Sequence, residues 1–298
     1  MLGTHRLRLL VALADTGSIA GAAQATGGSA AAASQQLARL ERESRAQLLE
    51  RSARSVRLTA AGELLVGRAR RILADLEAAE QDVAAAGSAG GGRLRVGSFA
   101  TAAHRFVVPV LGTLRRRHPA LRLSFAELEP EDALPAVRAG ELDVAVTHRY
   151  HPLAAPETGG LRRVSLYTDP MLLAVPAGTA DGPADLGGFR GVDWVATYPD
   201  RGFQAVTEMT ARLAGFEPRI VGRAAGYPVL LDLVAAGLGV GLVPRSAATP
   251  RAGITLLEIT APAGLHRVVE LATRAADGSP AIAEFRRELR SRVARARR

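Results

Sequence analysis

The chain has no cysteine and no lysine, and aromatic residues make up only 4% of its 298 residues. Without cysteine, the sequence offers no disulfide, no thiolate ligand for a metal ion and no cysteine nucleophile. Because lysine is absent, all 38 basic residues are arginine. This composition is typical of a GC-rich genome and is by itself weak evidence for a nucleic-acid partner.

Long apolar runs are absent as well. Runs such as Met171–Pro176 are far too short to cross a bilayer. The apolar stretch near the N-terminus is followed at once by Asp15 and by no small-residue cleavage site. We therefore expect a cytoplasmic protein that begins with a helix rather than a signal peptide. An apolar content of 48% excludes a disordered chain.

The length predicts two or three domains, at roughly 100–200 residues per domain. The net charge of +9 is concentrated at the two ends, because residues 1–58 carry +4 and residues 285–298 carry +6. A basic N-terminal module would suit phosphate groups. The arginine-rich tail is more typical of a solvated face on a final helix.

Short amphipathic helices are predicted within residues 1–58. Ser18 and Ser29 are suitable N-caps for two of them, and a turn at 26–28 separates those two. The apolar positions at helical spacing are Leu7, Leu10, Val11, Ala14, Ile19, Ala22, Ala23, Ala33, Leu37 and Leu40. Two short helices joined by a glycine-bearing turn are typical of a helix-turn-helix unit, although any small helical bundle has the same pattern.

A hairpin and a long helix are predicted next. Alternating polarity from Arg54 to Leu58 suits a short hairpin, whose arginines Arg54 and Arg57 would meet the DNA backbone or minor groove if it is a wing. A helix over residues 60–86 carries a heptad seam made of Leu65, Ala69, Ile72, Leu76, Ala79 and Val83. The seam favours pairing of two chains, with packing on its own domain as the alternative. Residues 87–92 are a glycine-rich linker.

From residue 93 onward, strands and helices alternate. Strands at 94–97, 121–125 and 143–147 with helices at 106–118 and 133–139 predict a βαβαβ unit with a mostly parallel sheet. A second series follows, with strands at 171–175, 194–196, 219–221 and 240–243 and helices at 203–214 and 228–236. A strand at 268–273 and a helix from Pro280 complete the chain. Two such subdomains would leave a ligand cleft between them.

Several segments together resemble the LysR-type transcriptional regulators. The matching stretches are 10–23, 29–41, 48–51, 56–62, 138–146 and 234–244, which follow the family's order along essentially the whole chain. The resemblance implies a winged helix-turn-helix domain over 1–58, a linker and dimerisation helix with its hinge over 59–92, and an α/β effector domain over 93–298. The effector domain would have two Rossmann-like subdomains, as periplasmic binding proteins do, with subdomain I at about 93–163 and 266–298 and subdomain II at about 164–265.

The chain departs from the family pattern at four positions of the DNA-binding module. Thr26 and Gly28 stand where members usually have apolar residues, and Ser44-Arg45 replaces the usual Leu-Gly. Each lost buried side chain costs on the order of 1–3 kcal/mol, so we expect a less stable or more mobile module.

The resemblance makes residues 29–41 a recognition helix, which enters the major groove with its N-terminal residues toward the bases. Gln35 can bond adenine in a bidentate way, alanines can touch thymine methyl groups, and Arg39 suits a phosphate. The expected DNA contacts are Ser29, Ala30, Ala31, Ser34, Gln35, Arg39, Arg54 and Arg57. A merely solvated helix face is the alternative.

The effector would bind in the cleft, with an anionic group at a helix start. The expected effector-binding residues are Ser98, Thr101, Thr147, His148, Tyr198, Arg201, Phe203 and Tyr227. His148 could pair with an acidic effector or sense pH. For each of these residues, an ordinary loop position is the alternative.

Enzyme signatures are missing. There is no nucleophile elbow, phosphate-binding loop or zincin motif, and the glycine run at 237–241 follows a helix and precedes a strand, which is the reverse of a dinucleotide site. His104, His148 and His151 lack further ligands at metal spacing. We therefore expect no catalytic residues, cofactor or metal. The sequence predicts a regulator that binds promoter DNA as a homodimer or homotetramer and responds to a small effector, for which an anionic group is expected. The alternative is a soluble binding protein with a degenerate DNA module.

Overall fold

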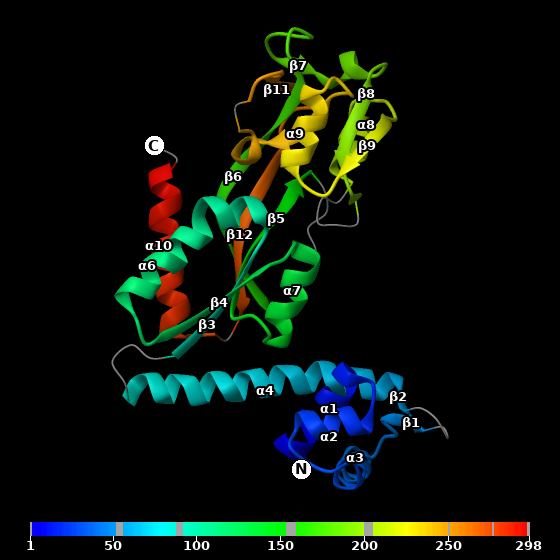
Figure 1. Ribbon diagram of the computed structural model, residues 1–298, viewed down its shortest axis with the longest axis vertical. Helices are drawn as coiled ribbons and strands as arrows, with labels where there is room; N and C mark the ends of the chain where they lie inside the picture. The colour runs from blue at the N-terminus through cyan, green and yellow to red at the C-terminus, as the bar shows by residue number, and fades with distance from the viewer. Residues whose placement is uncertain are drawn as a thin grey trace. The chain divides into compact units, whose positions relative to one another are not determined.

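The computed structural model describes residues 2–51, 56–87, 92–152, 159–199, 205–249, 251–275 and 277–296. Its contacts divide the chain into two compact units (Figure 1). The first comprises Met1–Arg93 with Arg138–Leu142, and the second comprises Leu94–Val137 with Asp143–Arg298. Each unit has its own buried core.

Three helices, a hairpin and a long helix build the first unit. They are α1 (Thr4–Thr16), α2 (Ile19–Ala25), α3 (Ala30–Ser44), β1 (Leu49–Arg51), β2 (Val56–Leu58) and α4 (Ala60–Gly87). The expected caps form, because the hydroxyl oxygens of Ser18 and Ser29 accept the backbone N–H groups of Gly21 and Ala32. Leu7, Leu10, Ala22, Ala23, Ala33, Leu37 and Leu40 are buried as expected, Val11, Ala14 and Ile19 are partly buried, and Leu9 and Leu13 join the core in addition. The helix-turn-helix pattern and the hairpin are thus confirmed.

The positions that depart from the family pattern are accommodated in two ways. The Thr26 hydroxyl donates to the carbonyl of Ala22 at 2.8 Å, so this half-buried polar group has a partner. Ser44 likewise donates to the carbonyl of Glu41 at 3.0 Å. Arg45, however, ends α3 at φ 53°, in the left-handed region that glycine adopts without strain. The replacement of the family's glycine therefore costs backbone strain rather than packing.

Helix α4 packs on the first unit at its N-terminal end. A Cβ on Gly62 would lie 2.2 Å from the carbonyl oxygen of Leu48, so only glycine allows the helix to start this close to the chain before the hairpin. Further along, Val66, Ala69 and Leu73 are buried in the unit's core. The first turns of α4 are thus part of this domain's own structure.

The second unit is built on an eight-stranded sheet with a separate two-stranded one. Its strands are β3 (Gly92–Ser98), β4 (Leu121–Glu127), β5 (Val144–His151), β6 (Leu161–Pro176), β7 (Ala184–Asp185), β8 (Asp193–Thr197), β9 (Arg219–Ala224), β10 (Gly241–Pro244), β11 (Ile254–Ala261) and β12 (His266–Arg274). Its helical segments are α5 (Ala100–Ala102), η1 (Ala103–Val107), α6 (Val108–Arg117), α7 (Pro130–Ala139), η2 (Leu186–Phe189), α8 (Val206–Leu213), α9 (Tyr227–Ala235), η4 (Arg245–Ala247) and α10 (Pro280–Ala296).

The main sheet is mixed, which corrects the expectation of a mostly parallel one. Its order is β4-β3-β5-β12-β6-β11-β7, and β10 also pairs with β6. β3 and β5 are parallel as expected, but β12 runs antiparallel to both β5 and β6. Buried strands have the same apolar pattern in either direction, so the sequence could not show this reversal. The sequence pattern also predicted neither β11 nor the full length of β6.

Strand β6 carries the chain from one part of this unit to the other. Residues 161–170 pair with β12, and residues 171–176 pair with β10 and β11. Because side chains alternate along a strand, Met171, Leu173 and Val175 enter a core with α8, whereas Leu172 and Ala174 enter a core with α9. In the part of the sheet where β6 pairs with β12, helices α6 and α10 cover one face and α7 lies on the other (Figure 1).

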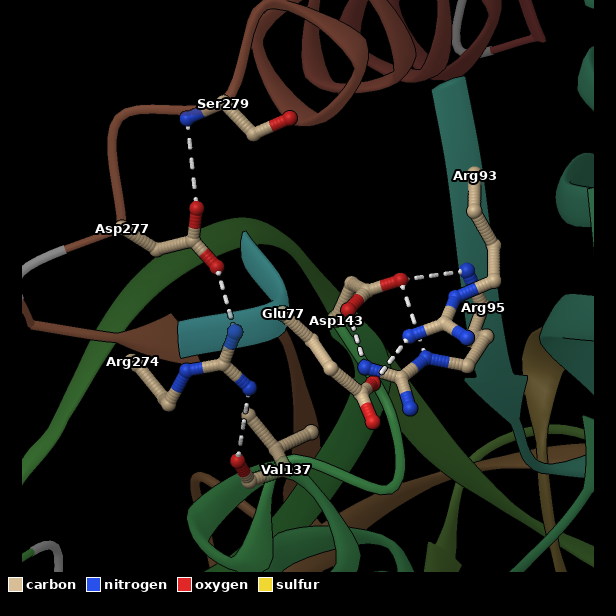
Figure 2. A network of polar contacts seen from close by, with 8 residues as sticks. All are labelled: Glu77, Arg93, Arg95, Val137, Asp143, Arg274, Asp277 and Ser279. Carbon is tan, nitrogen blue, oxygen red and sulfur yellow. Dashed lines mark hydrogen bonds and ion pairs between the residues drawn. The ribbon is translucent and has the colours of Figure 1, made fainter. Parts of the chain in front are cut away.

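Polar contacts fix the end of this sheet at which β3 and β5 begin and β12 ends. Figure 2 shows the guanidinium of Arg95 on β3 paired with the carboxylate of Asp143 before β5, at 2.7 Å. Asp277 accepts N–H groups from Arg274 at 3.0 Å and from the backbone of Ser279 at 3.2 Å, at the start of α10. These pairs join strand ends and a helix start, so their role is structural.

Candidate functional site

The outer face of α3 carries the residues that were predicted to contact DNA. Ala30, Ala31 and Gln35 are exposed, and Ser34 is half-buried. The opposite face, with Ala33, Leu37 and Leu40, is buried in the core. Ser29 caps the helix through its hydroxyl, so its side chain already accepts one backbone N–H. The polar and small residues at the start of α3 are therefore presented on one surface.

Arg39 lies on the same helix but is held in an ion pair. Its Nε is 3.1 Å from Glu43 Oε1, and Glu43 also binds Arg6 of α1 at 2.8 Å. The side chain of Arg39 is still 59% exposed, so the pair is weak and solvent-screened. A phosphate group could compete for this guanidinium, in line with the role expected of it.

The hairpin presents one of its two expected arginines. Arg57 on β2 is exposed and pairs in register with Glu50 of β1. Arg54 lies outside the described residues. Arg57 is thus available to a partner on the surface of the hairpin.

The heptad seam of α4 divides into two parts. Ala69 is fully buried in the core of its own unit and Leu65 packs against it. Ile72 is 46% exposed, Val83 is 74% exposed and Ala79 is exposed as well. The alternative of packing on its own domain therefore holds at the N-terminal end of the seam. The exposed part leaves pairing with a second chain as a prediction.

A cavity of about 470 Å³ lies in the second unit. Seven elements contribute to its wall, namely the start of α5, η1, the end of β4, β5, the start of α9, η4 and β12. The residues that line it are Phe99, Ala100, Thr101, His104, Arg105, Glu127, Glu129, His148, Ala225, Gly226, Tyr227, Pro228, Ser246, Ala247, Thr249 and Arg267. Its wall is mostly apolar, with a few charged and hydroxyl groups, as is typical of a small-molecule site.

Three of the predicted effector-binding residues line this cavity, namely Thr101, His148 and Tyr227. Thr147 does not, because neighbouring residues of a strand point to opposite faces and only His148 faces the cavity. Ser98 is fully buried on β3, and Tyr198 is 40% exposed; neither is in the wall. These three residues thus lie outside the wall, and their contact with an effector stays a prediction. Arg201 and Phe203 lie outside the described residues.

Arg267 is the main cavity residue that sequence reasoning missed. Its side chain is only 1% exposed, and it donates to Asp169 Oδ2 at 2.8 Å and to the hydroxyl of Ser246 at 3.0 Å. Burial lowers the pKa of Arg267, but Tyr150, Tyr227 and Asp169 outweigh this and raise it, so the guanidinium stays charged. The one sequence signal for Arg267 was its position directly before the apolar residues Val268 and Val269 of the predicted strand.

Glu129 and His148 face each other in the wall. His148 Nε2 lies 3.4 Å from Glu129 Oε2, yet neither Glu129 Oε2 nor His148 Nδ1 has a hydrogen-bond partner among the described residues. Burial raises the pKa of Glu129 to about 7, opposed by Arg267 and assisted by Glu131 and Glu127. Burial, with help from Arg267 and Arg163, lowers the pKa of His148 well below its ordinary value. The histidine is therefore neutral, and the carboxyl group titrates near neutrality.

Two tyrosines connect β5 to α9 beside the cavity. The hydroxyl groups of Tyr150 and Tyr227 are 2.8 Å apart, and both side chains are buried. Burial raises the pKa of each phenol, so both stay neutral. This hydrogen bond holds the start of α9 against the strand that carries His148.

Two other kinds of feature, a metal-binding cluster and a membrane-spanning helix, are absent from the described residues. No group of three or more histidine, aspartate or glutamate side chains that could hold a metal ion occurs in the described part of the chain. Within those same residues, no helix is long and apolar enough to cross a membrane.

Two family models match the chain. Residues 4–63 match the bacterial regulatory helix-turn-helix protein model of the lysR family, and residues 87–294 match the LysR substrate binding domain. A probable hydrogen peroxide-inducible genes activator of Mycobacterium leprae is 32% identical over 288 residues, which are 92% of this chain and 89% of the relative. The nitrogen assimilation regulatory protein nac of Klebsiella aerogenes is 30% identical over 256 residues, which are 85% of this chain and 81% of the relative.

A solved structure agrees along nearly the whole length. Full-length CbnR, crystallised with its target DNA, is 25% identical, with a TM-score of 0.64 over 97% of this chain and 99% of its own. The family consists of transcriptional regulators and not of enzymes. The exposed face of α3, the hairpin and the cavity thus occur in the domains that both models describe. The chain belongs to the LysR family and is a DNA-binding transcriptional regulator with an effector-binding domain.

Proposed function

We propose that a small-molecule effector binds the cavity lined by His148, Tyr227 and Arg267 and thereby changes the affinity of the regulator for its promoter. The observation that carries this proposal is the cavity itself, in which buried polar atoms of Glu129 and His148 have no partner among the described residues. Unpartnered buried polar atoms are costly unless a ligand or water satisfies them.

That the effector is anionic stays a prediction. The residue that would bind its anionic group is Arg105 rather than Arg267. Arg267 is already neutralised by Asp169, whereas Arg105 is exposed at the cavity and Thr101 offers a hydroxyl beside it. An anionic group of the effector would therefore lie at the α5 end of the cavity.

Thiol oxidation is not available to this chain. The name of the Mycobacterium leprae relative concerns peroxide induction, and one way in which proteins sense peroxide is oxidation of a reactive thiolate. This chain's 298 residues contain no cysteine. We therefore propose reversible binding of a ligand in place of thiol oxidation.

The domains are proposed as 1–58 for DNA binding, 59–92 for dimerisation and 93–298 for the effector. Within the last, subdomains of about 93–163 with 266–298 and of about 164–265 would flank the cavity. The exposed residues Ile72 and Val83 of α4 support a homodimer or homotetramer, since apolar side chains on a helix gain by pairing.

The test of DNA binding uses gel shifts on the region upstream of the chain's own gene. Gln35→Ala should relax base preference at one position, at a cost of about 1–3 kcal/mol for a lost bidentate contact. Arg57→Ala should weaken binding to all sequences alike and reduce its salt dependence. If the folded protein protects no promoter fragment, the alternative of a soluble binding protein with a degenerate DNA module holds instead.

A further inference from the structure

We infer that the ligand of this cavity carries a protonated amine, which binds the Glu129 carboxylate, on a mainly apolar body. The inference rests on the proposed effector role of the cavity. It adds the chemical class of the ligand and names the residue that selects it.

The charges of the wall favour a basic group at this place. Arg267 would be the obvious partner of an anion, but Asp169 neutralises it at 2.8 Å, and its charge faces the Phe99 ring at 4.7 Å from the centroid. Two carboxyl groups, Glu127 and Glu129, line the same wall. An anionic group placed beside Glu129 would meet those carboxylates. The exposed arginine of the wall, Arg105, is not among the charges that shift the pKa of Glu129, so it would not offset them there.

The hydrogen-bonding state of Glu129 indicates a missing donor. Its Oε2 is buried and has no partner in the described part of the chain, although its side chain as a whole is 28% exposed to the cavity region. His148 Nε2 is the nearest ring nitrogen at 3.4 Å, but the two atoms form no hydrogen bond. His148 is 1% exposed and neutral, so it supplies no compensating charge. A ligand ammonium group would provide both the donor and the charge.

The rest of the wall fits an apolar ligand body. Phe99, Ala100, Ala225, Pro228 and Ala247 surround the polar groups, in a cavity of about 470 Å³ that has room for a small aromatic molecule. Phe99 and His148 are themselves in edge contact at 4.5 Å between centroids, which gives an aromatic surface beside Glu129. The ligand would thus place an apolar group here and its nitrogen at Glu129.

A matched set of three probes tests the inference on the full chain. 3-Phenylpropan-1-amine, 3-phenylpropan-1-ol and 3-phenylpropionate share one skeleton and differ in the terminal group. Titration calorimetry should show the amine binding at least tenfold more tightly than the alcohol, and the propionate most weakly. Equal affinities, preference for the propionate, or no binding of any probe at millimolar concentration would overturn the inference.

Two variants locate the effect at Glu129. Glu129→Gln keeps the shape and removes a charge that burial disfavours, so the variant should fold; it should lose the amine preference and bind the alcohol as before. Glu131→Gln is the matched control, because Glu131 is an exposed neighbouring carboxylate outside the cavity wall. It should keep the preference to within a factor of about three, as expected for a screened charge. An amine preference that survives in Glu129→Gln contradicts the inference.

Acidity gives a second readout. The groups that face Glu129 are His148 on β5, Arg267 on β12, Glu127 at the end of β4 and Glu131 on α7. Since only the ionised carboxylate pairs with an ammonium group, the amine affinity should fall about tenfold from pH 8 to pH 6 for a pKa of about 7, and stay flat in Glu129→Gln. Gel shifts of the same protein separate the regulatory role of the cavity from the chemical class of its ligand. Absence of DNA binding by the folded chain would refute the regulatory role. The probe titrations alone decide the ligand class.

Discussion

The two units of this chain use arginine–carboxylate pairs in opposite ways. In the first unit, Arg39 and Glu43 pair on the surface of α3, where the arginine is 59% exposed. In the second, Arg267 and Asp169 pair beside the cavity with exposures of 1% and 3%. An exposed pair is screened by water and can exchange its partner for a phosphate, whereas a buried pair must stay intact. The surface pair is therefore available for binding DNA, and the buried pair shapes a site for another ligand.

Removal of Arg267 should have the largest effect and is the most direct test of this contrast. Arg267→Met leaves the Asp169 carboxylate buried without a cation, so we expect a loss of about 3–5 kcal/mol in the free energy of unfolding, measured by urea denaturation. Arg39→Ala should cost less than about 1 kcal/mol. The double variant with Asp169→Leu should recover part of the Arg267→Met loss. Equal losses for Arg39→Ala and Arg267→Met would remove the distinction.

The same contrast explains how much the sequence could predict. The predicted DNA-contact face lies on one helix, so the spacing of Ala33, Leu37 and Leu40 was enough to place Gln35 on the opposite side. The cavity is assembled from seven separate elements, and local patterns could place only residues such as His148 and Tyr227 at strand or helix ends. Arg267 escaped prediction because its partner Asp169 lies 98 residues away on another strand. The antiparallel direction of β12, which brings those two residues together, leaves no trace in the apolar pattern.

A pH titration of stability should give the next largest effect. Glu129 has a folded-state pKa of about 7 against an ordinary value of 4.5, so its protonated form is the one that folding favours. Its contribution to stability is complete below pH 4.5 and is lost as the pH rises through 7. We therefore compare the free energy of unfolding of Glu129→Gln with that of wild type at pH 8 and at pH 4. This difference should favour the variant by about 2–3 kcal/mol more at pH 8 than at pH 4, as measured by denaturation at both pH values. A difference that does not change with pH would place Glu129 in a solvated setting.

Gly62 tests the rigidity of the first unit. A methyl group at this position would lie 2.2 Å from the carbonyl oxygen of Leu48, so α4 would have to move away from the chain before the hairpin. We expect Gly62→Ala to lose about 1–3 kcal/mol despite the higher helix propensity of alanine. Gly67→Ala is the matched control on the same helix, because a Cβ there meets nothing within 4 Å. Thermal unfolding should show the control gaining stability, and a gain for both variants would show that α4 is free to shift.

The smallest expected effect is a gain, and it concerns the turn after α3. Arg45 holds φ at 53°, where a residue with a Cβ is strained and glycine is not. Arg45→Gly should stabilise the first unit by about 1 kcal/mol, as measured by urea denaturation. Arg42→Gly in the last turn of the same helix has the opposite expectation, a loss of about 1 kcal/mol, because there glycine only adds freedom to the unfolded chain. Losses in both variants would mean that the Arg45 side chain contributes more than its backbone costs. A gain for Arg45→Gly alone would show that the DNA-binding module tolerates local strain at its surface.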